Sequence, residues 1–142
     1  MARKRIRSKI MQEVKVAPKR VRKRNNRHRY VPTIKECQMW FDVINREVFG
    51  NSLERFRRIE IRRRHGCWAE TESTLNPDGE RFCTLSLNHH FKSKKHFLDV
   101  MTHEMVHHYE WTILQREMTH GYQFYKWKPK LKRFGLSLTY AS

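Results

Sequence analysis

The feature that most constrains this chain is the pentapeptide His-Glu-Met-Val-His at residues 103–107. It lies in a stretch from Lys94 to Leu114 that contains no Gly or Pro, and Ser93 can cap the first turn, so we expect a helix here. Residues four positions apart share one face of a helix. His103 and His107 can therefore bind one metal ion.

The same pattern indicates the chemistry of that ion. Zinc (Zn²⁺) is expected, because imidazole suits it and a catalytic zinc site keeps one position for water. Such a water ionises near a pKa of about 7, and Glu104 lies where its carboxylate can accept the proton. The alternative is a helix with two surface imidazoles and an unrelated Glu.

A third metal ligand is needed, and we predict that it is His120. This residue follows an expected helix end at residues 117–119 and precedes Gly121, where the chain can turn into a second helix. A His at the start of that packed helix can point back at the first helix. Glu110, one turn beyond the pentapeptide, and Glu117 are the alternatives.

Other titratable residues near the motif have supporting roles in this interpretation. Asp99 lies one turn before His103 and can accept a hydrogen bond that orients its ring, although an exposed helical Asp is an equal alternative. We expect His89, His90 and His108 to face solvent or to support the ligands from outside.

The remaining sequence predicts the elements around this helix. A first helix over residues 33–49 begins with a capping box, Thr33 with Glu36, and has an apolar face. Three short strands follow between residues 57 and 88, with a hairpin turn at residues 76–79. Pro129 should kink or restart the C-terminal helix. We expect a small α+β domain with one N-terminal helix, a short, mainly antiparallel sheet, the motif helix and a C-terminal helix.

The pentapeptide belongs to an ordered series of motifs over about residues 33–135. The series comprises Trp40-Phe41, Ile59–Ile61, Gly66–Ala69, Cys83–Asn88, Thr102–His107, and His120-Gly121 with Phe124 and Trp127. It resembles the SprT-like family of zinc metallopeptidases, which includes the Spartan proteases. The resemblance implies a zincin-like metalloprotease domain in which His103, His107 and His120 bind Zn²⁺ and Glu104 is catalytic.

Positive charge is concentrated at the N-terminus. The chain carries a net charge of +17, and residues 1–30 hold thirteen Lys or Arg against the single acid Glu13, which gives +12. We therefore predict a flexible basic arm over residues 1–30 and a folded domain over residues 31–142.

Lys and Arg side chains of such an arm can bind the phosphates of DNA or another nucleic acid without reading sequence. The candidate residues are Arg20, Arg22, Lys23, Arg24, Arg27 and Arg29. We expect a basic patch to continue onto the domain through Arg55, Arg57, Arg58 and Arg62–Arg64. The alternatives are an arm that only aids solubility, or a nuclear targeting signal over residues 18–24.

Cysteine usage and hydropathy bear on the compartment. Cys37, Cys67 and Cys83 are an odd number without a close-spaced pair, which favours a reducing compartment without disulfides. No apolar run is long enough for a signal peptide or a membrane span. We expect a soluble protein that is not secreted and has no membrane partner. It would be cytoplasmic and nucleoid-associated, or nuclear in a eukaryotic cell.

The leading hypothesis is a zinc-dependent endopeptidase, recruited by the basic arm. The resemblance implies that its substrates are proteins associated with or crosslinked to DNA. A substrate strand would pair with an exposed sheet edge, for which Cys83–Asn88 is the candidate. The alternative is a non-catalytic, zinc-containing module that binds nucleic acid or protein and acts by occupying its partner. A zinc hydrolase acting on a non-peptide bond is a third, weaker hypothesis.

Overall fold

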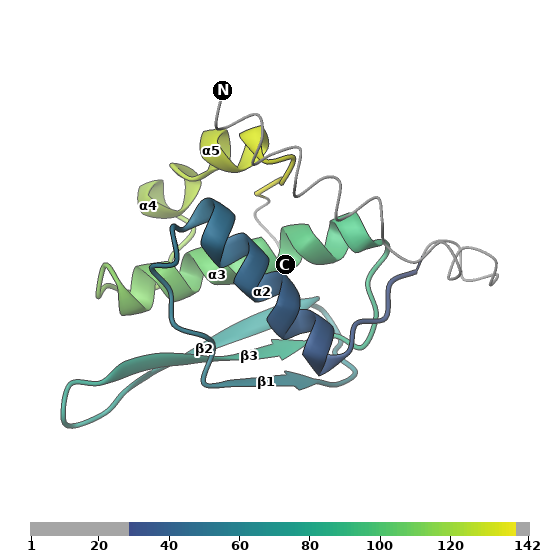
Figure 1. Cartoon of the computed structure of the whole chain (residues 1–142). Helices are drawn as coiled ribbons and strands as arrows, with labels where there is room; N and C mark the ends of the chain where they lie inside the picture. Colours follow the sequence, from purple (N-terminus) through teal and green to yellow (C-terminus); the bar gives the residue numbers. More distant parts are fainter. Residues whose placement is uncertain (1–28, 139–142) are drawn as a thin grey trace.

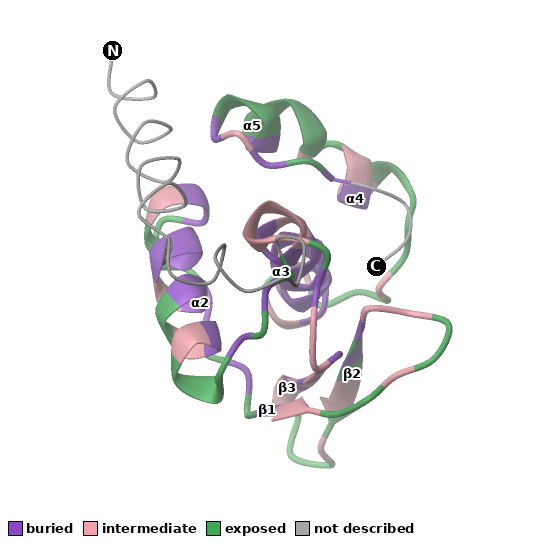
Figure 2. Cartoon of the chain, turned by 90° about the vertical axis from the view of Figure 1, so that its right-hand side faces the viewer, coloured by how far each residue is buried: buried purple, intermediate pink, exposed green. Residues whose placement is uncertain are grey.

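A 19-residue helix, α3 (Lys94–Thr112), lies at the centre of the protein, as the computed structural model shows for residues 29–138 (Figure 1). Helix α2 lies on one side of α3, the sheet on a second, and helices α4 and α5 on a third (Figure 2). Ser93 caps α3 as predicted, since its side chain accepts a hydrogen bond from the His96 N–H. Because α3 is surrounded, six of its polar residues are buried within the protein: Thr102, His103, Glu104, His107, His108 and Glu110.

Helix α2 (Ile34–Val48) begins with the capping box that the sequence predicted. The Thr33 hydroxyl accepts a hydrogen bond from the Glu36 N–H at 3.1 Å, and the Glu36 carboxylate accepts one from the Thr33 N–H at 3.0 Å. The predicted apolar face is buried and consists of Cys37, Trp40, Phe41, Ile44 and Val48. This face packs α2 against the rest of the core.

The sheet contains strands β1 (Arg58–Ile61), β2 (Ala69–Leu75) and β3 (Arg81–Leu87) in the order β1-β3-β2. Strand β2 is antiparallel to β3 and joined to it by the predicted turn, in which the Gly79 N–H donates to the Asn76 carbonyl at 2.9 Å. Gly79 has φ +93°, a conformation that favours glycine. Strand β1 is parallel to β3, so the sheet is mixed.

The expectation that Cys83–Asn88 forms an exposed sheet edge was wrong. Strand β3 contains most of this segment and hydrogen-bonds to a strand on each side. Within the described residues, β2 and β1 are the edges. Alternation along β2 directs Thr71 toward α3 and Glu70 and Glu72 toward solvent.

The C-terminal part differs from the single helix that the sequence predicted. Helix α3 ends at Thr112, five residues before the expected end, and Gln115 adopts a left-handed conformation in the turn that follows. Two short helices then form, α4 (Tyr122–Tyr125) and α5 (Lys128–Arg133). Pro129 lies in the first turn of α5, which confirms the predicted restart.

Tyr30, which we assigned to the arm, belongs to the folded core. Its side chain is buried, and its backbone forms an isolated bridge with Phe91 through hydrogen bonds of 3.0 and 2.8 Å. The described part of the chain contains no helix long and apolar enough to cross a membrane.

Replacing Thr33 by Ala should lower the free energy of unfolding by about 1 kcal/mol, because the α2 N-terminus loses its side-chain acceptor. Chemical denaturation followed by circular dichroism measures this change. Lys35→Ala is the control, since Lys35 is exposed in the same turn and accepts no cap hydrogen bond. An equal effect of the two substitutions would contradict the capping role of Thr33.

Candidate metal centre

The three predicted histidines converge on one point. The Nε2 atoms of His103, His107 and His120 are each 3.2 Å from the other two. Three neutral imidazoles cannot all satisfy one another by N–H···N bonds in such a triangle, because each Nε2 atom is either a donor or an acceptor and at least two of the three must have the same role. The three residues lie close enough to bind one metal ion.

Glu110 sets the orientation of the His107 ring. Its carboxylate lies 3.1 Å from His107 Nδ1, so an Nδ1–H can donate to it and leave the Nε2 lone pair facing the other histidines. Glu110 is 0% exposed, and its second carboxylate oxygen has no hydrogen-bond partner among residues 29–138. A buried carboxylate without a Lys or Arg partner is costly, and a cation held by the histidines would lower that cost.

Phe124 holds the three rings together from one side. It is fully buried on α4, and its ring centroid lies 4.8 Å from those of His103 and His107 and 4.9 Å from that of His120. The chain turns at Gly121 directly before α4, which places His120 against α3 as predicted. Burial lowers the pKa of His120, and His107 lowers it further. A lowered pKa keeps the imidazole neutral, as a metal ligand must be.

Glu104 lies beside the histidines with its carboxylate fixed by the sheet. One carboxylate oxygen accepts a hydrogen bond of 2.7 Å from the Thr71 hydroxyl on β2, and the other lies 3.8 Å from His103 Nε2. Both Glu104 and Thr71 are buried. Thr71 was not predicted as a site residue, since no local sequence pattern shows that β2 packs next to α3.

The structure also decides between the other residues considered for the site. Glu117 is exposed and lies outside the cluster, and Glu110 supports His107 instead of joining the three imidazoles. Of the two alternatives for Asp99, the structure excludes the one in which this residue orients the His103 ring. Its carboxylate pairs with Lys95 at 2.6 Å and accepts a hydrogen bond from the Ser137 N–H.

His108 was expected to face solvent or to support the ligands, and it does neither. It is 1% exposed, its Nε2 lies 2.7 Å from the Glu54 carbonyl, and its ring stacks on Phe56. Cys83 is buried near Glu104, and burial, followed by the Glu104 charge, raises its pKa to about 12. Its thiol therefore stays protonated at neutral pH, which disfavours it as a metal ligand.

The arrangement of the basic residues differs from the one that the sequence predicted. Arg20, Arg22, Lys23, Arg24 and Arg27 lie outside the described residues, and Arg29 is exposed. The arginines between residues 55 and 64 do not form a continuous basic patch, because five of the six pair with acids within 3.3 Å. The pairs are Arg55–Asp42, Arg57–Glu80, Arg58–Glu60, Arg62–Glu60 and Arg64–Glu70.

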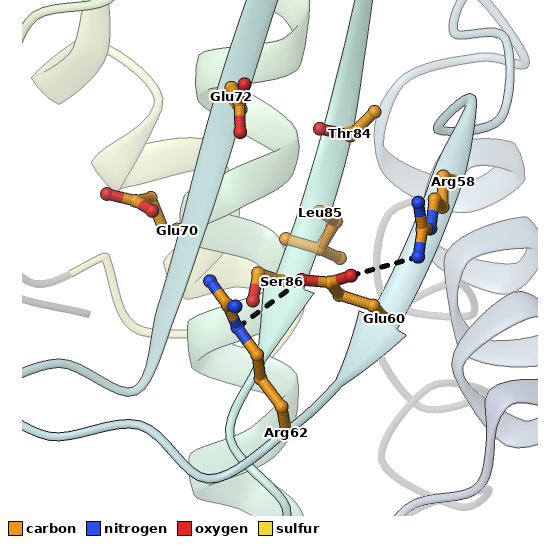
Figure 3. Close-up of a pocket in the computed structure, with 8 residues that line it drawn as sticks. All are labelled: Arg58, Glu60, Arg62, Glu70, Glu72, Thr84, Leu85 and Ser86. Carbon is orange, nitrogen blue, oxygen red and sulfur yellow. Dashed lines mark ion pairs between the residues drawn. The ribbon is translucent and has the colours of Figure 1, made fainter.

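Figure 3 shows this neutralisation on the open face of the sheet. Arg58 and Arg62 both point toward Glu60, and Glu70 and Glu72 line the same shallow pocket from β2. Its lining holds two arginines and three carboxylates. This face is therefore a poor surface for nucleic-acid phosphates.

No family model, no curated protein and no solved structure matches this chain.

Substituting His120 by Ala should weaken metal binding more than the roughly 10–100-fold expected for loss of an outer partner, because a direct ligand is removed. Competition with a chromophoric chelator measures the affinity. Glu117→Ala is the control, since this exposed carboxylate lies outside the cluster. Wild-type affinity in the His120 variant, or a loss in the Glu117 variant, would contradict the three-histidine assignment.

Proposed function

We propose that this protein is a zinc-dependent endopeptidase with a zincin-like, SprT-type active site, acting on proteins associated with or crosslinked to DNA. One observation carries the proposal: three histidines converge beside the buried carboxylate of Glu104, which follows the first of them in the sequence. That combination supplies both a metal site and a positioned base.

Zinc is the ion that this donor set favours. Zn–N bonds of about 2.0–2.1 Å at tetrahedral angles separate the nitrogens by about 3.3–3.4 Å, close to the 3.2 Å between the Nε2 atoms. Within residues 29–138, the cluster offers no fourth His, Cys, Asp or Glu ligand. Three protein ligands are typical of catalytic zinc, whereas structural zinc usually has four.

The residues of this chain then divide the reaction between them. When bound, zinc supplies a Lewis acid that lowers the pKa of water and polarises a carbonyl group. Glu104 accepts the proton of the water that attacks the peptide carbonyl and delivers a proton to the leaving amine. The Thr71 hydroxyl, 2.7 Å from Glu104, stabilises the ionised carboxylate and fixes its direction.

Strand β2 is the part of the sheet best placed to hold a substrate. Among residues 29–138 it pairs with β3 and with no other strand, and Thr71 in its middle contacts the catalytic carboxylate. An extended peptide pairing along the edge of β2 opposite β3 would lie beside the metal site. Backbone pairing selects extended segments more than particular sequences, as suits a protease for varied DNA-bound proteins.

The charge of the N-terminal segment supports the nucleic-acid part of the proposal. Residues 1–30 carry +12, and each contact of a Lys or Arg with a phosphate adds salt-sensitive, sequence-independent affinity. Attachment to DNA would raise the local concentration of substrates bound to the same DNA.

Glu104→Gln should keep the metal and lower cleavage by about 10²–10⁴-fold, because the amide cannot accept the proton. The assay is gel electrophoresis of a DNA-binding protein incubated with DNA and the zinc-loaded enzyme, with and without a chelator. Glu117→Gln is the matched control and should cleave like wild type. Retained cleavage in Glu104→Gln would refute the assigned role, and DNA binding without any wild-type cleavage would favour the non-catalytic module.

Thr71→Val should lower kcat/KM by about tenfold, because a hydrogen bond to a charged group is lost from a buried site. Without the donor the ionised carboxylate is less stable, so the acidic limb of the pH–rate profile should move to higher pH. Thr74→Val, on the opposite face of β2, is the control. An unchanged profile in the Thr71 variant would show that the hydroxyl has only a structural role.

A further inference from the structure

A second concave site lies away from the metal, where β1 and β3 end. It is a wide, open cavity of about 330 Å³ whose charged and titratable lining, within residues 29–138, is basic: Arg29, Arg63, Arg64, His65, His89 and His90. No carboxylate from the described part of the chain lines it, in contrast to the mixed lining of the pocket in Figure 3. The residues that line the cavity precede helix α3 in the chain. Because an α-helix rises about 1.5 Å per residue, His103 lies roughly 14 Å along the helix from its first residue, Lys94.

Asn88 joins the two loops that form the cavity. Its buried side-chain oxygen accepts hydrogen bonds from the His89 N–H at 2.8 Å and from the Arg64 N–H at 3.4 Å. Its own N–H donates to the Trp68 carbonyl at 2.8 Å. The loop after β1 and the loop after β3 are therefore fixed to each other, and the basic side chains share one preformed site.

The third wall is formed by the chain as it enters the folded domain. The backbone of Tyr30 is hydrogen-bonded in both directions to Phe91, next to His90. This bridge fixes Arg29 beside the two loops. In Figure 1 the entering chain and the ends of β1 and β3 lie on the same side of the molecule. Residues 1–28 precede Arg29, so the cavity lies where the basic segment joins the domain.

The arginines of the cavity differ in what they can bind. The Arg64 guanidinium already donates to Cys67, Ser86 and Glu70, so it braces the loop. Arg63 and Arg29 form no ion pair with any residue that the structure describes. Arg63 is thus the exception in the Arg-rich stretch, and its guanidinium can bind an external anion.

The local potential agrees with an anion site. Burial lowers the pKa of His90, and the charges of Arg29, His89 and Arg63 lower it further. The His89 and His90 rings lie 4.6 Å apart, with ring nitrogens 3.3 Å from each other. A bound anion would offset this concentration of positive charge and of N–H donors.

We propose that this cavity binds the phosphodiester backbone of a nucleic acid, with Arg63 and Arg29 as the direct phosphate ligands. The choice of a nucleic acid rests on the proposed function, and the cavity extends the basic arm onto the rigid domain. A strand bound along both would be held at a fixed place relative to the metal site. Proteins bound to that strand would then be presented to the enzyme in a restricted geometry.

The test is fluorescence anisotropy with labelled oligo(dT) of about 15 nucleotides and the full-length chain in the Glu104→Gln background. At about 0.15 M salt, Arg63→Glu should weaken binding about fivefold and reduce the slope of log K against log salt by about 1. Arg63→Lys should retain most of the affinity, since a cation remains.

Arg58→Glu is the matched control, because it changes net charge equally. Arg58 lines the separate pocket of Figure 3 on the open face of the sheet and does not line the cavity that contains Arg63. It is already paired with Glu60. Equal effects of Arg58→Glu and Arg63→Glu would overturn the proposal, because net charge alone would explain them. Thermal unfolding of each variant by circular dichroism shows whether the fold is kept; if Arg63→Glu unfolds, Arg63→Ala is compared with Arg58→Ala under the same criteria.

Two further binding measurements identify the ligand. An RNA oligomer of the same length should show the same dependence on Arg63, because the contacts are to phosphate. If Arg63→Glu weakens binding of a labelled poly-glutamate peptide but not of either oligonucleotide, the site takes acidic protein and the proposal fails. Binding is measured here in the Glu104→Gln background and therefore does not depend on cleavage. If the protein without that substitution fails to cleave while the Arg63 effect is observed, the protease function is contradicted and this site is supported.

Discussion

The arrangement of the protein depends on one short-range constraint: three imidazole nitrogens 3.2 Å apart inside a small core. Two of them come from the central helix, and the third comes from a loop that must return to that helix. The side chain of Phe124 fills the space behind all three rings. Helix α4 therefore contributes to the site, because it begins just after His120 and carries Phe124.

The central helix α3 buries polar side chains at positions where a helix with only a packing role would bury apolar side chains. His103, Glu104, His107 and Glu110 are all buried in α3. Thr71 donates to Glu104 and Glu110 accepts from His107, so partners from the sheet and from the helix itself reduce the cost of burial. Burial also limits water around the carboxylates and strengthens the interactions among them. The stability of the fold and the chemistry of the site are thus linked through the same few residues.

Local sequence patterns predicted what local physics determines. The capping box of α2, the β2–β3 turn and the restart at Pro129 each depend on neighbours within a few residues, and each was confirmed. His120 was also placed correctly, because the following Gly121 indicated a turn. The central position of β3 was not predicted, since strand order depends on pairing between distant segments. The prediction of a basic patch over the Arg-rich stretch was wrong for the same reason, because the acidic partners of these arginines include Asp42 and Glu80, which lie far away in the sequence.

The proposed reaction requires a metal ion with three protein ligands and one accessible position. X-ray absorption spectroscopy of the zinc-loaded protein, combined with anomalous diffraction from its crystals, measures this directly. We predict one zinc ion per chain, bound by the Nε2 atoms of His103, His107 and His120 and by one oxygen that does not belong to the protein. A fourth protein ligand, or zinc bound elsewhere in the chain, would contradict the account.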